Sequence, residues 1–102
     1  MSQDQARSCR RRSERMSARA QVLVHCRNRF QRAKVADYSQ VGLHLEGTFG
    51  LIPTDPVQIE LISGVRVPGK VEWSLGGRTG IAFSERLEPS HPAIVELGRK
   101  SG

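Results

Sequence analysis

The sequence DYSQVG at residues 37–42 connects two β-like runs and constrains the fold more than any other stretch. It follows the basic run 32–38 and leads directly into an alternating apolar segment. An acid at Asp37, a hydroxyl at Ser39 and a glycine at Gly42 suit a sharp reversal between strands. Asp and Ser side chains bond local backbone groups or an incoming molecule, and glycine permits positive φ or close approach. Taken alone, this D-x-S-x-x-G pattern also fits an ordinary hairpin turn.

Short β-like segments flank this turn on both sides. Apolar residues alternate with polar ones most clearly over 57–62, and Gly-containing turns are predicted at 63–64 and 76–77. Pro68 and Gly69 interrupt one run and predict an edge or a bulge there. Strands are predicted over 21–25, 32–38, 43–46, 57–62, 65–67 continuing through 70–73, and 79–83.

The remaining segments complete an all-β fold. Residues 47–55 predict a loop from which Leu51 and Ile52 point inward, and 90–100 predict a helix capped by Ser90 or His91. Short, evenly spaced strands form an antiparallel sheet that must close or pack on itself. We therefore expect a six-stranded antiparallel barrel with a C-terminal α-helix over residues 20–102, preceded by a flexible Arg-rich arm over 1–19.

The charge distribution predicts an anionic partner. The net charge is +6, and ten of the sixteen Lys and Arg residues precede Val35. Nucleic acid, a lipid surface, a nucleotide and an acidic protein all fit this charge. Cys9 and Cys26 fit neither a disulfide framework nor a zinc pattern. No apolar run is long enough to span a bilayer. We expect a cytoplasmic monomer with no membrane insertion.

A second motif lies in the arm, where residues 10–15 are RRRSER. Arg11 and Arg15 are four residues apart. Clustered arginines usually form a solvated basic tail, but a guanidinium also binds phosphate bidentately, pairs with the O6 and N7 edge of guanine, or stacks on a base. Two or three such guanidinium groups on a flexible arm can close over a flat, doubly charged ligand, and the motif by itself fits this arm and a solvated tail equally.

Together these motifs resemble the PilZ domain family. The match rests on R-x-x-x-R, then two strands, then D-x-S-x-x-G, followed by VEW at 71–73 and GRTGIAF at 77–83. It spans about residues 10–100. The resemblance implies a receptor for the bacterial second messenger cyclic di-GMP, with no other cofactor.

The resemblance also implies roles for individual residues. Arg11 and Arg15 would hold phosphates and guanine Hoogsteen edges, Asp37 and Ser39 would receive a guanine edge, and Gly42 would leave room for it. Arg10 and Arg12 add cationic reach, and an arginine directly before the motif implies an intercalated ligand dimer. Trp73 is assigned to the core or to the border of the site, with the core favoured. His25, His44 and His91 are interpreted as incidental.

The chemistry of Asp37 supports a guanine ligand independently. A carboxylate repels phosphate but accepts the neighbouring N1–H and N2–H donors of guanine. In this hypothesis the ligand orders the arm on the barrel and creates a surface for an unidentified downstream protein.

Two alternatives stay open. One is a PilZ-fold adaptor that binds protein but no nucleotide. The other is a small nucleic-acid-binding barrel, which is disfavoured because none of the five aromatic residues obviously lies in a basic strand face. An enzyme is not expected, since the sequence has no catalytic triad, paired carboxylates or metal-ligand cluster.

Overall fold

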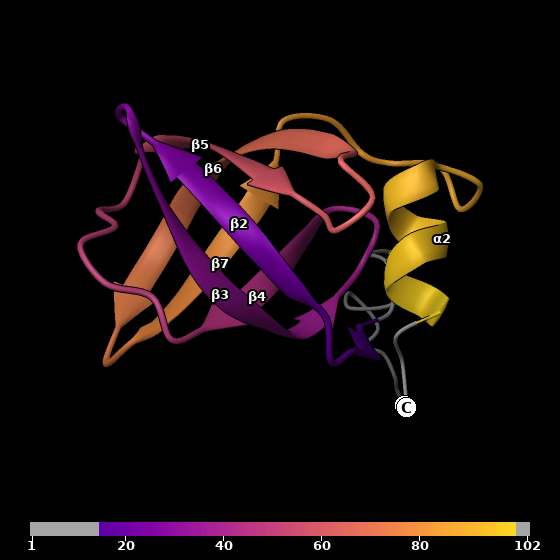
Figure 1. Ribbon diagram of the computed structural model, residues 1–102, viewed down its shortest axis with the longest axis horizontal. Helices are drawn as coiled ribbons and strands as arrows, with labels where there is room; N and C mark the ends of the chain where they lie inside the picture. The colour runs from indigo at the N-terminus through magenta and orange to yellow at the C-terminus, as the bar shows by residue number, and fades with distance from the viewer. Residues whose placement is uncertain (1–14, 100–102) are drawn as a thin grey trace, which may run out of the picture.

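The computed structural model describes residues 15–99, which form a closed six-stranded antiparallel barrel with one extra strand and one C-terminal helix (Figure 1). The sheet order is β1-β3-β2-β5-β6-β7-β4, and a further pairing of β3 with β4 closes the barrel. This confirms the predicted fold class. The elements are β1 (Met16–Ser17), β2 (Gln21–Cys26), β3 (Arg29–Tyr38), β4 (Gly42–Glu46), β5 (Pro56–Glu60), β6 (Arg66–Leu75), β7 (Arg78–Phe83) and α2 (Pro92–Arg99).

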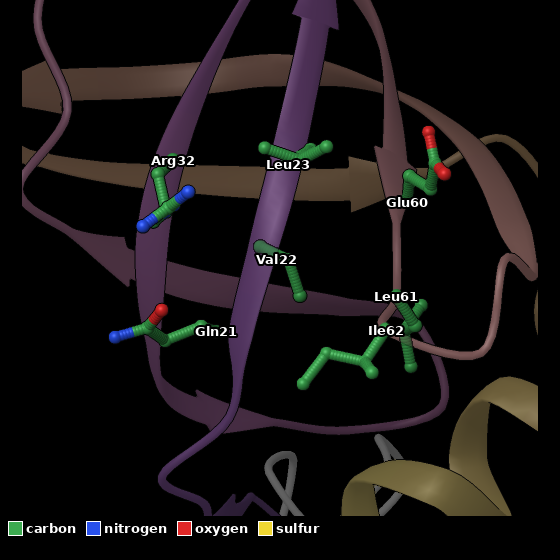
Figure 2. A pocket seen from close by; sticks show the side chains of 7 residues that line it. All are labelled: Gln21, Val22, Leu23, Arg32, Glu60, Leu61 and Ile62. Carbon is green, nitrogen blue, oxygen red and sulfur yellow. The ribbon is translucent and has the colours of Figure 1, made fainter.

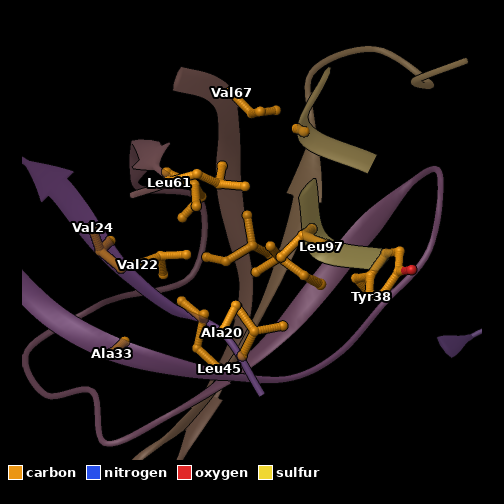
Figure 3. Close-up of a cluster of buried hydrophobic side chains, with 14 of the residues drawn as sticks. Ala20, Val22, Val24, Ala33, Tyr38, Leu45, Leu61, Val67 and Leu97 are labelled. Carbon is orange, nitrogen blue, oxygen red and sulfur yellow. The ribbon is translucent and has the colours of Figure 1, made fainter. Parts of the chain in front are cut away.

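The core lies inside the barrel, where inward-facing residues of the strands meet. Alternation of apolar and polar residues places one face of each strand inward, and Val35, Leu45 and Ile59 are fully buried. Helix α2 covers one end of the barrel, and Figure 3 shows its Leu97 reaching into this cluster beside Tyr38. Burial of these apolar groups is the main force that closes the barrel.

The last residues of the predicted arm lie on the barrel. Met16 and Ser17 pair with the end of β3, Ala18 is buried, and the Ala18 backbone N–H donates to the Ala36 carbonyl at 3.3 Å. Residues 1–14, which include Arg10, Arg11 and Arg12, lie outside the described residues. The division of the chain at residue 19 stays a prediction.

The prediction of an edge or bulge at Pro68 and Gly69 is confirmed in part. Pro68 pairs with β5 but has no partner in β7, whose pairing with β6 begins at Gly69, and the bulge of this strand lies further on, between Val71 and Trp73. Strand β6 runs without interruption from Arg66 to Leu75 and pairs with both β5 and β7. The Pro68 carbonyl accepts from the Ser84 N–H at 2.9 Å, just beyond the end of β7. A residue in a strand directs its N–H and C=O to the same side. Proline therefore omits only a terminal bond of this ladder.

The helix and the 47–55 loop largely follow the sequence pattern. His91 caps α2, because its Nδ1 accepts from the Ala93 N–H at 3.0 Å. Leu51 is buried as predicted, but Ile52 is 54% exposed. A tight turn explains the difference: the Asp55 carboxylate accepts from the Ile52 N–H, and the Asp55 N–H donates to the Ile52 carbonyl, each at 3.0 Å.

Candidate functional site

The candidate site is a row of residues that crosses five strands on the outside of the barrel. The register places Ser17 of β1 opposite Asp37 of β3, Asp37 opposite His44 of β4, His44 opposite Gly80 of β7, and Gly80 opposite Trp73 of β6. Residues far apart in the sequence therefore meet on one surface.

Two β-bulges turn the polar and aromatic ends of this row outward. One lies between Val35 and Asp37, and the other precedes Trp73. Since side chains alternate, Val35 and Asp37 would share the inner face of a regular strand. The extra residue Ala36 reverses this and leaves Asp37 outside. In β6, the extra residue Glu72 places Trp73 on the outer face in the same way. Bulges commonly re-aim a side chain beside a functional site.

The two sequence motifs meet at Arg15. Its Nε and one terminal nitrogen donate to Asp37 Oδ1 at 2.8 and 2.5 Å, and its other terminal nitrogen donates to Ser39 Oγ at 3.1 Å. Ser39 is buried, and its Oγ also accepts from the Val41 N–H at 3.2 Å. The short turn from Ser39 to Gly42 thus holds the hydroxyl in place. Asp37 and Arg15 remain about one-third exposed and reachable from solvent.

His44 lies in this row and contacts Asp37, a contact that its interpretation as incidental does not include. Its Nδ1 lies 2.9 Å from Asp37 Oδ1, and its ring centroid lies 5.4 Å from that of Trp73. It alternates with the buried Leu43 and Leu45, which indicates an outward-facing side chain. Its contact with Asp37 depends on the β3–β4 register, which the sequence does not display.

The surroundings of Asp37 change its acidity. Partial burial raises the pKa of this carboxyl, but hydrogen bonds from Arg15 and His44, together with their charges, outweigh that effect and lower the pKa below its ordinary value. Asp37 is therefore a carboxylate at neutral pH. An anionic acceptor beside Arg15 and His44 suits a ligand that brings N–H donors.

Trp73 lies on the outer face and is 39% exposed, so its favoured assignment to the core is wrong. Its indole lies over Gly80, where an added Cβ would overlap the ring. A Cβ at Gly42 would overlap the Ile81 carbonyl of β7. In the structure Gly42 therefore serves close strand packing. Its role in leaving room for a ligand stays a prediction, as do the ligand contacts of the other predicted residues.

A separate hollow of about 280 Å³ lies on the outer face of β2 and β5 (Figure 2). Figure 2 shows Arg32 and Glu60 on opposite sides of Leu23, with Ile62 next to Leu61 below them. The Glu60 carboxylate already binds His25 at 2.7 Å and Arg66 at 3.2 Å. This hollow brings together none of the predicted site residues.

Residues 15–99 contain neither a metal-binding cluster nor a membrane-spanning helix. Within this range no group of His, Cys, Asp and Glu side chains is arranged to hold a metal ion. The same range contains no helix of the length and apolar character needed to cross a membrane.

The family model described as PilZ domain matches residues 10–97, nearly the whole chain. A search of curated proteins found no match.

Proposed function

The chain belongs to the PilZ domain family, whose members bind cyclic di-GMP or act as adaptors, and we propose that this protein is a cyclic di-GMP receptor. The observation that carries the proposal is the contact of Arg15 with Asp37 and Ser39. It joins the two motifs at one exposed point of the barrel. A binding module rather than an enzyme also agrees with the family.

The Arg15–Asp37 contact supports a specific mode of guanine recognition. A guanidinium and the Watson–Crick edge of guanine both present neighbouring N–H donors in one plane. Arg15 thus places on Asp37 the same kind of group that guanine brings. In the proposed mechanism the guanine edge takes over the carboxylate, and the released Arg15 turns to a phosphate.

The exchange conserves charge-assisted hydrogen bonds. Asp37 accepts from guanine in place of Arg15, and Arg15 donates to phosphate in place of Asp37. The net gain comes from the additional contacts of the ligand and from the bonds of Arg15 to phosphate, because the Arg15–Asp37 pair that they replace is about one-third exposed and contributes little. We propose that Arg10, Arg11 and Arg12 supply these contacts, as cations that bind phosphates and Hoogsteen edges.

Trp73, with the His44 ring beside it, would form the aromatic side of the proposed site. An aromatic ring that is partly exposed on a rigid strand offers a stacking surface for a purine. Trp73 lies at the end of the row opposite Asp37. The row therefore offers a hydrogen-bonding end and a stacking end.

The arm provides the proposed output. Binding would order the part of the arm that carries Arg10, Arg11 and Arg12 on the barrel and create a new surface for a downstream protein. Ordering a segment costs conformational entropy, so the ligand must contact the ordered state more favourably than the free one.

Isothermal titration tests the proposal directly. Cyclic di-GMP is titrated into the full chain, with GTP as the ligand control and Arg15→Ala as the variant control. We expect micromolar or tighter binding that the variant weakens and GTP does not reproduce. The fitted ratio distinguishes one nucleotide per chain from an intercalated pair. Absence of heat with cyclic di-GMP would leave the nucleotide-independent adaptor.

A further inference from the structure

The end of the barrel farthest from α2 exposes two of the three phenylalanines. We call this region the hairpin end; it consists of the β2–β3 hairpin, residues 26–30, and the loop 47–55 (Figure 1). Phe30 is 67% exposed and Phe49 is 70% exposed. The Gln31 side chain donates to the Phe49 carbonyl at 2.8 Å and accepts from the Phe49 N–H at 3.0 Å. The loop is thereby fixed beside the hairpin.

Phe30 and Phe49 line the same cleft, whose volume is about 150 Å³. Its lining includes the buried Val24 and Leu51 and, at its edge, Arg29. An apolar floor between two aromatic side chains suits one large aliphatic or aromatic side chain, which would lose its contact with water there.

A cationic hollow of about 620 Å³ adjoins this cleft and shares Phe30 and Arg29 with it. Arg27 and Arg66 also line it, and no carboxylate occurs among its described lining residues. Arg27 binds Asp55 at 2.6 Å and Arg66 binds Glu60 at 3.2 Å. Arg29 forms no ion pair within residues 15–99. The hollow thus presents guanidinium donors next to the apolar cleft.

The backbone of this end holds an uncommon conformation. Within residues 15–99, the non-glycine residues with positive φ are Arg27 (53°), Asn28 (67°) and Thr54 (77°), and all three lie here. Such residues carry a conformational cost and tend to gather at functional sites. The Arg27–Asp55 ion pair links the hairpin to the loop, so the surface is preformed.

We propose that the hairpin end is a docking surface for a protein segment that carries carboxylates beside a large apolar side chain. The apolar side chain enters the cleft between Phe30 and Phe49, and the carboxylates bind Arg29 and its neighbours. Exposed aromatic and arginine side chains around a small pocket are typical of interface hot spots. A single nucleic-acid strand would instead require successive aromatic platforms along a basic groove, whereas both rings here border one cleft.

This surface is separate from the candidate nucleotide site. Phe30 and Asp37 lie seven residues apart on β3, or roughly 23 Å along the strand. Docking at the hairpin end does not rest on cyclic di-GMP binding, and either proposal can fail without the other.

Selection from a phage-displayed random dodecapeptide library on the full chain tests the surface. We expect enriched peptides that combine Asp or Glu with Leu, Phe or Trp. In ¹⁵N–¹H spectra, the best peptide should shift the amides of Phe30, Phe49 and Leu51. Oligothymidine titrated in parallel should leave these amides unshifted.

Matched variants identify the contacts. Phe30→Ala and Phe49→Ala should each weaken the selected peptide at least about fivefold, the loss typical of a contributing interface residue. Arg29→Glu should weaken it further. As controls, Ile62→Ser removes a similarly exposed apolar side chain from the hollow in Figure 2, and Arg99→Glu reverses a charge on α2. Neither control should change the affinity for the selected peptide.

Three results would overturn the proposal. One is a library that enriches no peptide on the wild type relative to a Phe30→Ala/Phe49→Ala double variant with an unchanged melting temperature. Another is enriched peptides that lack acidic residues or shift amides elsewhere. The third is oligothymidine that binds at the cleft more tightly than any peptide, which would assign this end to nucleic acid.

Discussion

Arg15 donates two N–H groups to a single oxygen of Asp37, and a further N–H to Ser39, across 22 and 24 residues of sequence. One guanidinium therefore links the R-x-x-x-R motif to both polar members of the D-x-S-x-x-G motif. In the proposed mechanism the same three residues separate and re-form their bonds around the ligand.

Arg15 should determine much of the affinity for cyclic di-GMP. Arg15→Ala should weaken binding roughly tenfold to over a hundredfold, because each charge-assisted hydrogen bond contributes about 1.5–3 kcal/mol. The affinity of Arg15→Lys should lie between those of the wild type and Arg15→Ala, since an ammonium keeps the charge but not the planar fork. Isothermal titration measures the difference, with Arg19→Ala as the control for loss of one nearby arginine. Equal affinities for Arg15→Ala and Arg19→Ala would contradict the assignment.

Asp37 should determine the choice of base. Its carboxylate accepts two neighbouring donors that guanine has and adenine lacks. Asp37→Ala should therefore reduce the preference for cyclic di-GMP over cyclic di-AMP as well as the affinity. Competition of the two dinucleotides for the wild type and the variant measures this preference. Unchanged affinity and selectivity in Asp37→Ala would exclude base recognition by this residue.

Acidic pH should remove the contribution that Asp37 makes to the free energy of unfolding. The folded structure lowers the pKa of Asp37 below the ordinary 3.8, so this carboxyl stabilises the folded state fully at pH values above the unfolded pKa. The contribution is lost as the pH falls below about 4 and through the folded pKa. We expect the free energy of unfolding of the wild type to exceed that of Asp37→Asn at pH 6, and the excess to shrink towards pH 3.

Denaturant titrations of the two proteins across this range measure the excess. The difference between them isolates Asp37 from the other carboxyl groups, which titrate in both. An excess that is constant from pH 6 to pH 3 would show that Asp37 gains nothing from Arg15 and His44 in the folded protein.

We expect that position 80 needs a glycine because the Trp73 ring occupies the space of a side chain there, and not because the strand backbone needs a glycine. A Cβ at position 80 would overlap the indole, so Gly80→Ala should displace the ring and destabilise the barrel by about 1–3 kcal/mol. In a Trp73→Ala background the same change should cost much less, since the overlap is gone. A double-mutant cycle from thermal unfolding measures this coupling. Equal costs in both backgrounds would show that the glycine is needed for another reason, and Trp73 fluorescence would then stay unchanged in Gly80→Ala.

The barrel could be predicted from the sequence because the alternation of apolar and polar residues is visible within each strand by itself. Leu43 and Leu45 identify the inner face of β4 without knowledge of its neighbours, and the same pattern marks β5. The two bulges are different, because an extra residue is visible only against a paired strand. Alternation with the buried Val71 would place Trp73 inside the barrel, and the bulge that places it outside is a property of the pairing with β7. The contact of His44 with Asp37 depends on the β3–β4 register. The tolerance of Pro68 likewise depends on where β7 ends.

The row from Ser17 to Trp73 draws on five strands, and the β3–β4 pairing that closes the barrel places Asp37 beside His44. The row extends from Ser17 to Gly80 in the sequence, so no short fragment of the chain can contain the assembled row. Recognition would consequently be an all-or-none property of the closed barrel. A ligand bound across the row would stabilise every strand together, by an amount that grows with the logarithm of its concentration. Bound second messenger would in this way also protect the protein from unfolding and proteolysis, so that the level of the signal would influence the lifetime of its own receptor.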